Sequence, residues 1–172
     1  MLNSDNYFAI FGLEPKFNID EALLRKRYYA LQQQVHPDSF DSNEEQAERA
    51  MAVNEAYYHL VSPINRARHL LQLSGMKLDE EDDNLPAPEP VLLMELIEIR
   101  EAIEGATTEK QLLSYFKNIE HDLELLWKDF ADKYDDHKID LAAKALVKAQ
   151  YWVKLIAEIK QKISLLGYDH AN

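Results

Sequence analysis

The 172-residue chain contains no cysteine and is short of positive charge. The lack of cysteine excludes disulfide bonds, thiol nucleophiles, and zinc or iron–sulfur sites held by the chain's own sulfur atoms. Only 19 Lys and Arg residues stand against 31 Asp and Glu, for a formal net charge of −12. Because nucleic acids and anionic membranes are bound largely through Lys and Arg, we expect neither as a main partner.

Long apolar runs are also missing. No stretch approaches the roughly 20 apolar residues that a membrane-spanning helix needs. The first 15 residues, MLNSDNYFAIFGLEP, have neither the basic start and long apolar core of a secretory signal nor the arginines of a transit peptide. The sequence therefore predicts a cytoplasmic protein.

Glycine and proline are scarce, with four and six residues, and apolar residues recur at helical spacing almost throughout. This pattern predicts an all-α protein. Three prolines, at positions 86, 88 and 90, directly follow the acidic run 79–83, which is typical of a linker. We therefore expect a domain at 1–75, a linker at 76–90 and a second domain at 91–172. The formal charge is −3 over residues 1–74 and −9 over residues 75–172.

The first domain is expected to contain a helical hairpin. Asn18 and Glu21 have capping-box spacing and open a helix that must end before Pro37. A second box, Ser42 to Glu45, opens the next helix. Its predicted inner stripe is Ala47, Ala50, Met51, Asn54, Tyr57 and Val61. The loop between the two helices, residues 36–40, is short, so the helices should be antiparallel neighbours.

The second domain shows three amphipathic segments, which predict an antiparallel three-helix bundle. The first segment ends at Gly105, and Thr107 or Thr108 caps the second. The predicted core stripes are Leu92, Leu96, Ile99 and Ile103; Leu112, Phe116, Ile119, Leu123, Leu126, Phe130 and Tyr134; and Ile139, Ala142, Leu146, Ala149, Trp152, Ile156, Ile159 and Ile163.

The first bundle helix also carries apolar residues away from its core stripe. At about 100° per residue, Leu93, Met94 and Ile97 fall on a second face, and Glu101 and Glu104 border it. An apolar cluster rimmed by carboxylates is typical of a protein-binding surface. The residues alone also allow Leu93 and Ile97 to pack beneath the linker or against the first domain.

The tripeptide His36-Pro37-Asp38 lies at the tip of the predicted hairpin, where a loop held by two helices can present side chains to a partner. With the opening Tyr7-Phe8-Ala9-Ile10-Phe11-Gly12-Leu13, residues 5–62 resemble a J domain. The resemblance implies binding to an Hsp70-class chaperone and stimulation of its ATPase. The residues implied are His36, Pro37 and Asp38, with Arg25, Lys26 and Arg27 as the basic patch. Ser39 and the base-free run 29–34 depart from the usual pattern, which favours a dedicated chaperone.

The segment after the hairpin, SPINRARHLLQLSG at 62–75, resembles the P-x-x-RA-x-x-LL-x-L-x-G pattern of HscB co-chaperones of iron–sulfur cluster assembly. That resemblance implies an HscA-type Hsp70 and an IscU-type cluster scaffold as partners. The implied scaffold contacts are Leu93, Met94, Ile97, Glu98, Glu101 and Tyr151, with Tyr151 expected to be exposed. Gly105 stands where a further acidic contact is expected. The chain starts without the zinc-binding cysteine segment of some eukaryotic relatives, which favours a bacterial-type form.

Other functions find little support in the sequence. The six histidines show no paired ligand spacing, and the acidic run lacks the pattern of a calcium loop, so we expect no metal and no cofactor. No nucleophile elbow or phosphate-binding loop is present, and an enzyme is not expected. Two alternatives remain open: a J-domain co-chaperone for a different client, and a helical adaptor in which residues 36–38 form an ordinary turn.

Overall fold

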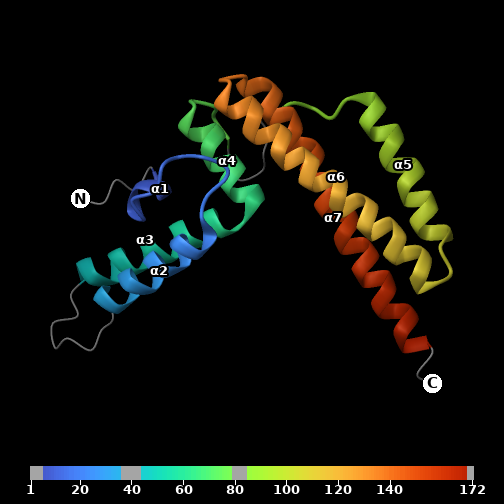
Figure 1. Cartoon of the computed structure of the whole chain (residues 1–172), viewed down its shortest axis with the longest axis horizontal. Coiled ribbons are helices and arrows are strands. Elements are labelled where there is room, and N and C mark those ends of the chain that lie inside the picture. Colours follow the sequence, from blue (N-terminus) through green and yellow to red (C-terminus); the bar gives the residue numbers. More distant parts are fainter. Residues whose placement is uncertain (1–5, 36–43, 79–84, 170–172) are drawn as a thin grey trace. The chain divides into compact units, whose positions relative to one another are not determined.

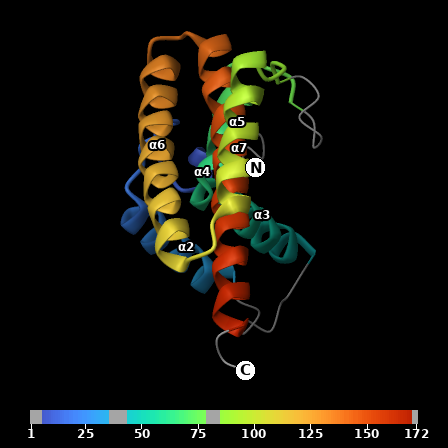
Figure 2. The same ribbon diagram turned by 90° about the vertical axis from the view of Figure 1, so that its right-hand side faces the viewer.

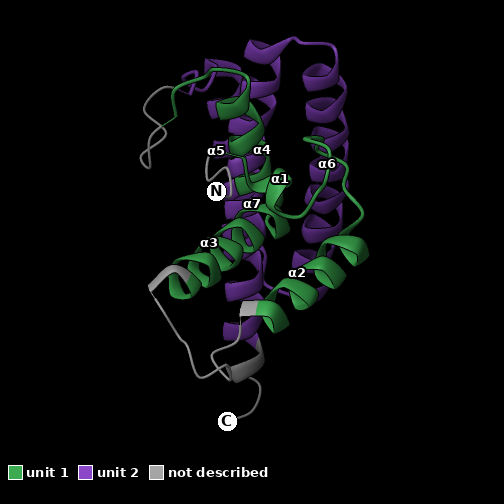
Figure 3. Cartoon of the chain, turned by 90° about the vertical axis from the view of Figure 1, so that its left-hand side faces the viewer, with its two compact units in different colours: residues 1–78 green, residues 79–172 purple. Residues whose placement is uncertain are grey.

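The computed structural model describes residues 6–35, 44–78 and 85–169, and every regular element within them is a helix (Figure 1). In chain order the helices are α1 (Tyr7–Ile10), α2 (Glu21–Val35), α3 (Glu44–Val61), α4 (Pro63–Leu73), α5 (Pro90–Gly105), α6 (Glu109–Asp135) and α7 (Ile139–Asp169). The predicted all-α class is confirmed. The chain divides into two compact units, which we call unit 1 (residues 1–78) and unit 2 (residues 79–172) (Figure 3).

The start of α2 differs from its prediction by two residues. Asp20, and not Asn18, precedes the helix, and its side-chain oxygen accepts a hydrogen bond from the Leu23 amide at 2.9 Å. Asp20 therefore fills the role of the first-turn cap, which a Ser, Thr, Asp or Asn side chain commonly takes. The other predicted box begins at Ser42, which lies outside the described residues.

The face that α3 turns to its core also differs from the prediction. Val53, Ala56 and Leu60 are the buried residues, whereas Ala47, Met51, Asn54 and Val61 are exposed. Leu60 follows Met51 by nine residues, which at about 100° per residue places the two on opposite sides of the helix. The centre of the predicted stripe is rotated by about a third of a turn from the buried face. Two of its members, Ala50 and Tyr57, are half-buried, and Tyr57 stacks on Tyr28 of α2.

A buried arginine holds the start of α4 to its surroundings. The Arg66 guanidinium donates to the Leu60 carbonyl oxygen at 3.1 Å, lies 3.6 Å from a Glu21 carboxylate oxygen, and sits 5.0 Å from the centre of the Phe17 ring. Because burial removes water from a charge, such a residue persists only where these partners replace it. One side chain therefore connects α2, α3 and the loop that contains Phe17.

The short helix α1 is attached through Tyr7. The Tyr7 backbone N–H donates to His69 Nε2 at 3.0 Å, and the Tyr7 ring stacks on His69 and on His59 with centroid distances of 4.3 and 4.7 Å. The Tyr7 hydroxyl donates to Glu55 at 2.7 Å. Desolvation, followed by this hydrogen bond, raises the pKa of Tyr7 to about 12. His69 must be neutral to accept the backbone hydrogen bond.

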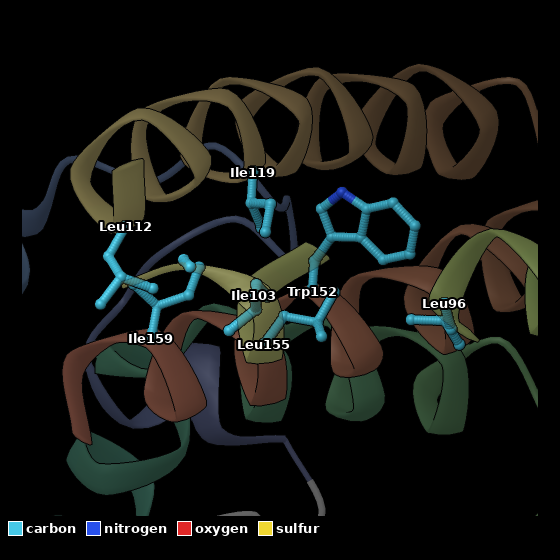
Figure 4. Packing of buried hydrophobic residues seen from close by; sticks show 8 residues of the cluster. Leu96, Ile103, Leu112, Ile119, Trp152, Leu155 and Ile159 are labelled. Carbon is cyan, nitrogen blue, oxygen red and sulfur yellow. The ribbon is translucent and has the colours of Figure 1, made fainter. Parts of the chain in front are cut away.

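Unit 2 is a three-helix bundle in which α6 and α7 pack along each other and the shorter α5 lies against α7 (Figure 2). Its core comes from all three helices (Figure 4), and all of its buried residues except Ala106 and Leu155 belong to the predicted stripes. The buried cluster is Leu96, Ile103, Ala106, Leu112, Ile119, Trp152, Leu155 and Ile159. Leu92 and Ile99 are partly buried against it, which confirms the predicted inner stripe of α5.

Helix boundaries in unit 2 follow the expected signals. α5 ends at Gly105, as predicted. Thr108 caps α6 in a complete capping box with Gln111, in which each side chain bonds the other's backbone N–H. Among the described residues, no helix is both long enough and apolar enough to cross a bilayer.

Candidate partner-binding sites

The first candidate site is the loop between α2 and α3. Its predicted residues His36, Pro37 and Asp38 lie outside the described residues. The two helices that lead into the loop are held together by the Tyr28 and Tyr57 rings, which stack with centroids 4.0 Å apart. The Tyr28 hydroxyl also donates to the Asn54 side-chain oxygen at 3.0 Å. The helices on both sides of the loop are thus braced against each other.

The three predicted bases on α2 lie in different surroundings. Arg25 and Lys26 are exposed, whereas Arg27 is half-buried and its Nη1 donates to the carbonyl oxygens of Phe11 and Gly12. Gly12 has φ +59°, and a Cβ there would lie 3.2 Å from Arg27 Nη1. Arg27 therefore fixes the turn after α1, and Arg25 and Lys26 remain as solvent-facing bases.

The second candidate site is an exposed apolar surface on α5. Leu93, Met94 and Ile97 have exposed fractions of 42, 64 and 57%. Leu93 and Ile97 therefore do not pack beneath the described part of the linker, residues 85–89. Glu98 and Glu101 are exposed beside them. Large apolar side chains gathered at the surface mark interaction sites more often than scattered ones do.

Val91 belongs to the same surface and was missed in the sequence. It is 75% exposed and precedes Met94 by three residues, so both lie on one side of the helix. The periodicity did not identify Val91, because this residue directly precedes Leu92, the first residue of the predicted core stripe. We refer to Val91, Leu93, Met94 and Ile97 as the α5 patch.

Tyr151 on α7 is less exposed than predicted. Its side chain is half-buried and packs against the bundle core, with Lys154 Nζ 5.6 Å from the ring centre. The prediction rested on the angle between Tyr151 and the core stripe of α7 and did not include contacts with α5. Arg100 of α5 lies close enough to interact electrostatically with Tyr151. Tyr151 is therefore placed where α7 borders α5.

Arg100 joins these two helices directly. Its Nη2 and Nε donate to the two carboxylate oxygens of Glu158 at 2.9 and 3.3 Å. The hydrogen bonds that Arg100 donates to Glu158 raise the pKa of Arg100, and the charges of Glu158, Tyr151 and Glu104 add to this effect. A bidentate pair of this kind fixes orientation as well as distance.

A cavity of about 240 Å³ lies between residues 86–89, α6 and α7. Each lysine that lines it is paired with a carboxylate: Lys133 with Asp129 at 2.6 Å, Lys144 with Glu89 at 2.7 Å, and Lys148 with Glu95 at 3.0 Å. These pairs leave little charge for a ligand to neutralise. Across the part of the chain that the structure describes, no three His, Asp or Glu residues gather as a metal site requires.

Comparison with known proteins gives the class of the first unit. Residues 6–69 match the family described as "DnaJ domain", and residues 88–160 match the "HSCB C-terminal oligomerisation domain". The chain is therefore a J-domain co-chaperone with a second, HscB-type helical domain.

Similarity over the whole chain identifies the family of co-chaperones to which the protein belongs. A co-chaperone protein HscB homolog of Vibrio vulnificus is 30% identical over 170 residues, covering 94% of this chain and 96% of that protein. An Arabidopsis thaliana "iron-sulfur cluster co-chaperone protein HscB homolog" is 31% identical over 166 residues. That match covers 94% of this chain but 65% of the plant protein, slightly under two thirds of its length. The chain belongs to the HscB family of co-chaperones.

A solved structure supports the same assignment. The chaperone HscB from Vibrio cholerae superposes with a TM-score of 0.82 at 28% identity, over 94% of this chain and 99% of that one. The arrangement of a J domain followed by a helical bundle is thus shared over nearly the full length of both chains.

Proposed function

We propose that this chain stimulates the ATPase of a specialised, HscA-type Hsp70 and delivers an IscU-type iron–sulfur scaffold protein to it during the maturation of iron–sulfur proteins. The observation that carries the proposal is the α5 patch, an exposed apolar surface with Glu98 and Glu101 beside it. The family to which the chain belongs and the name of the plant relative support the same role.

The proposed contact with the chaperone uses His36, Pro37 and Asp38, with Arg25 and Lys26 as exposed bases. A co-chaperone can accelerate another protein's ATP hydrolysis only by binding its reactive conformation more tightly than its resting one. Asp38 would accept a charge-assisted hydrogen bond from an arginine of the chaperone. Pro37 restricts the loop, which lowers the entropy lost on docking.

The proposed contact with the scaffold uses Leu93, Met94, Ile97, Glu98, Glu101 and Tyr151. The apolar residues would supply most of the binding energy, because anchors of this type commonly cost about 1–2 kcal/mol each when truncated. The carboxylates suit a partner surface that carries Lys or Arg. Because one chain holds both partners, scaffold capture raises the effective concentration of the scaffold at the chaperone.

The first test is Asp38→Ala, assayed by steady-state ATP hydrolysis of an HscA-type Hsp70 with and without the scaffold. We expect stimulation to be lost while scaffold binding is unchanged. Glu48→Ala, an exposed change on α3, is the control and should stimulate normally. Full stimulation by the Asp38 variant would contradict the role of the loop.

The second test combines Leu93→Ala, Met94→Ala and Ile97→Ala and titrates the variant with the scaffold. We expect the dissociation constant for the scaffold to rise by more than about tenfold, since each anchor contributes at least about 1 kcal/mol. Leu125→Ala is the matched control, because Leu125 is an exposed leucine of the same unit on α6. Stimulated ATPase without any scaffold binding by the wild-type chain would instead favour a co-chaperone for another client.

We further propose that the chain contributes no catalytic group of its own and acts in the cytoplasm of a bacterial-type cell. The support is that its relatives are named as co-chaperones and that several are bacterial. ATP hydrolysis by the chain in the absence of an Hsp70 would contradict the first statement, and cell fractionation tests the second.

A further inference from the structure

Helix α5 has little core to hold it in place. Only Leu96 and Ile103 of its side chains are buried, whereas α6 contributes four buried residues and packs far more extensively on α7. Beside these, Leu92 and Ile99 are only partly buried against the core, and the outer side of α5 carries the α5 patch and exposed carboxylates. A helix with so narrow an apolar contact can rotate or shift unless other interactions fix it.

Polar contacts with α7 follow α5 from one end to the other. Glu89, just before the helix, pairs with Lys144 at 2.7 Å, and Glu95 pairs with Lys148 at 3.0 Å. At the far end, Lys162 Nζ donates to the carbonyl oxygens of Ile103 and Glu104 at 2.8 and 2.6 Å. These carbonyls belong to the last turn of α5, where the helix has few backbone donors of its own; Ile103 also accepts from the Ala106 N–H at 3.2 Å.

The pair Arg100–Glu158 lies within this series, at the border between the α5 patch and α7. Arg100 follows Ile97 by three residues and therefore lies one turn along the same side of the helix. Glu158 follows Tyr151 by seven residues, two turns along the same side of α7. The bidentate bond between Arg100 and Glu158 thus joins the patch-bearing side of α5 to the Tyr151-bearing side of α7.

We propose that Arg100 and Glu158 are a positioning pair, which fixes Tyr151 of α7 beside the α5 patch so that the two helices meet the scaffold as one surface. The inference rests on the proposed function, since it concerns how the scaffold-binding surface is assembled. It assigns no direct contact to Glu158. Its effect on binding passes through the relative placement of the two helices.

The test is Glu158→Gln, which keeps the shape of the side chain and removes its charge. We expect scaffold affinity to fall by about three- to fivefold, the size of effect that a partly exposed ion pair can produce. Circular dichroism should show unchanged helix content. Asp136→Asn is the matched control, because it removes the exposed ion pair with Lys138 at the α6–α7 turn, and its binding should equal that of the wild type.

Two further measurements separate positioning from direct contact. The charge exchange Arg100→Glu with Glu158→Arg should restore affinity, whereas a direct contact of either side chain with the scaffold would be lost in the exchanged protein. In a double-mutant cycle, Glu158→Gln should have no further effect in a Tyr151→Ala background, because the group that it positions is then absent.

The outcomes distinguish this inference from the proposed function. If the wild-type chain does not bind the scaffold, both are overturned. If the α5 patch variant binds weakly but Glu158→Gln binds as the wild type does, the positioning role alone is overturned. Equal losses from Glu158→Gln in the wild-type and Tyr151→Ala backgrounds would also overturn it, as would failure of the charge exchange.

Discussion

Unit 1 and unit 2 are both helical and both bury apolar side chains, but they differ in where their polar contacts lie. In unit 1, specific polar and ring contacts connect segments far apart in sequence, such as Arg66 with Leu60 and Glu21, and Tyr7 with His69. In unit 2, a continuous apolar cluster fills the bundle, and ion pairs lie at its edges. Unit 1 therefore adds buried polar contacts, through Arg66 and His69, to an apolar core, whereas the ion pairs of unit 2 lie at its edges.

The largest effect should come from the apolar core of unit 2. Leu112 is fully buried, so Leu112→Ala should lower the free energy of unfolding by about 3–4 kcal/mol. Tryptophan emission during urea unfolding measures this unit alone, because both tryptophans, Trp127 and Trp152, belong to it. The adjacent Leu113 is exposed, and Leu113→Ala should cost less than about 1 kcal/mol. Equal losses at the two positions would contradict the observed packing.

The next effect tests the polar contacts of unit 1. Arg66→Met keeps most of the side-chain volume but leaves the Leu60 carbonyl oxygen without its donor, at an expected cost of about 2 kcal/mol. Amide hydrogen exchange in α4 and at the end of α3 should report the loss. The exposed change Arg25→Met should leave exchange unchanged. Unaltered protection in the Arg66 variant would show that apolar contacts suffice in this unit too.

Acid should weaken unit 1 before unit 2. Desolvation, with a contribution from His59, lowers the pKa of His69 from 6.5 to about 4, and desolvation also lowers the pKa of His59. Neutral His69 therefore stabilises unit 1 fully above pH 6.5, and this contribution is lost as pH falls toward 4. At pH 5 more than half of that range has been crossed, so we expect a loss of the same order as for Arg66→Met.

Tyrosine near-ultraviolet circular dichroism of thermal unfolding at pH 7 and pH 5 measures this effect. His69→Gln provides the control, because a Gln side-chain oxygen can accept the Tyr7 hydrogen bond without titrating. Its unfolding should depend less on pH than that of the wild type. The described histidines of unit 2, His121 and His137, are exposed. A steeper pH dependence of tryptophan-monitored unfolding would show that acid weakens unit 2 more than unit 1.

The smallest expected changes in the free energy of unfolding come from one glycine in each unit, and they have opposite signs. Gly12 has a positive φ and lies close to Arg27, so Gly12→Ala should destabilise unit 1 by about 1 kcal/mol. Gly105 ends α5 with open space around it, so Gly105→Ala should stabilise unit 2 by about 0.5 kcal/mol. Changes of the same sign in chemical unfolding would contradict this assignment.

The bundle could be predicted from sequence because its burial is periodic. The stripe through Leu96 and Ile103, the end of α5 at Gly105 and the cap at Thr108 all follow from local spacing and turn chemistry. The exposure of Leu93, Met94 and Ile97 follows from the same rotation. Helical periodicity identifies the faces of a helix that packs along one side.

Other features depend on contacts that spacing does not encode. On α3 the predicted stripe is rotated from the buried face, and only packing selects the face through Val53 and Leu60. Arg27 looks like a surface base, yet the turn at Gly12 occupies it. Tyr151 lies off its own helix's core stripe, but it packs partly buried against the core that all three helices form. In each case a residue distant in sequence determines whether the side chain is exposed or buried.

The two sides of α5 have separate tasks. Leu96 and Ile103 face the bundle, while Val91, Met94 and Ile97 face outward, within one helix of 16 residues. Substitutions on the outward side leave the core undisturbed, so under the proposed function they would change scaffold affinity at little cost to folding. The proposed binding surface can therefore be altered by single substitutions, each of which keeps a folded bundle.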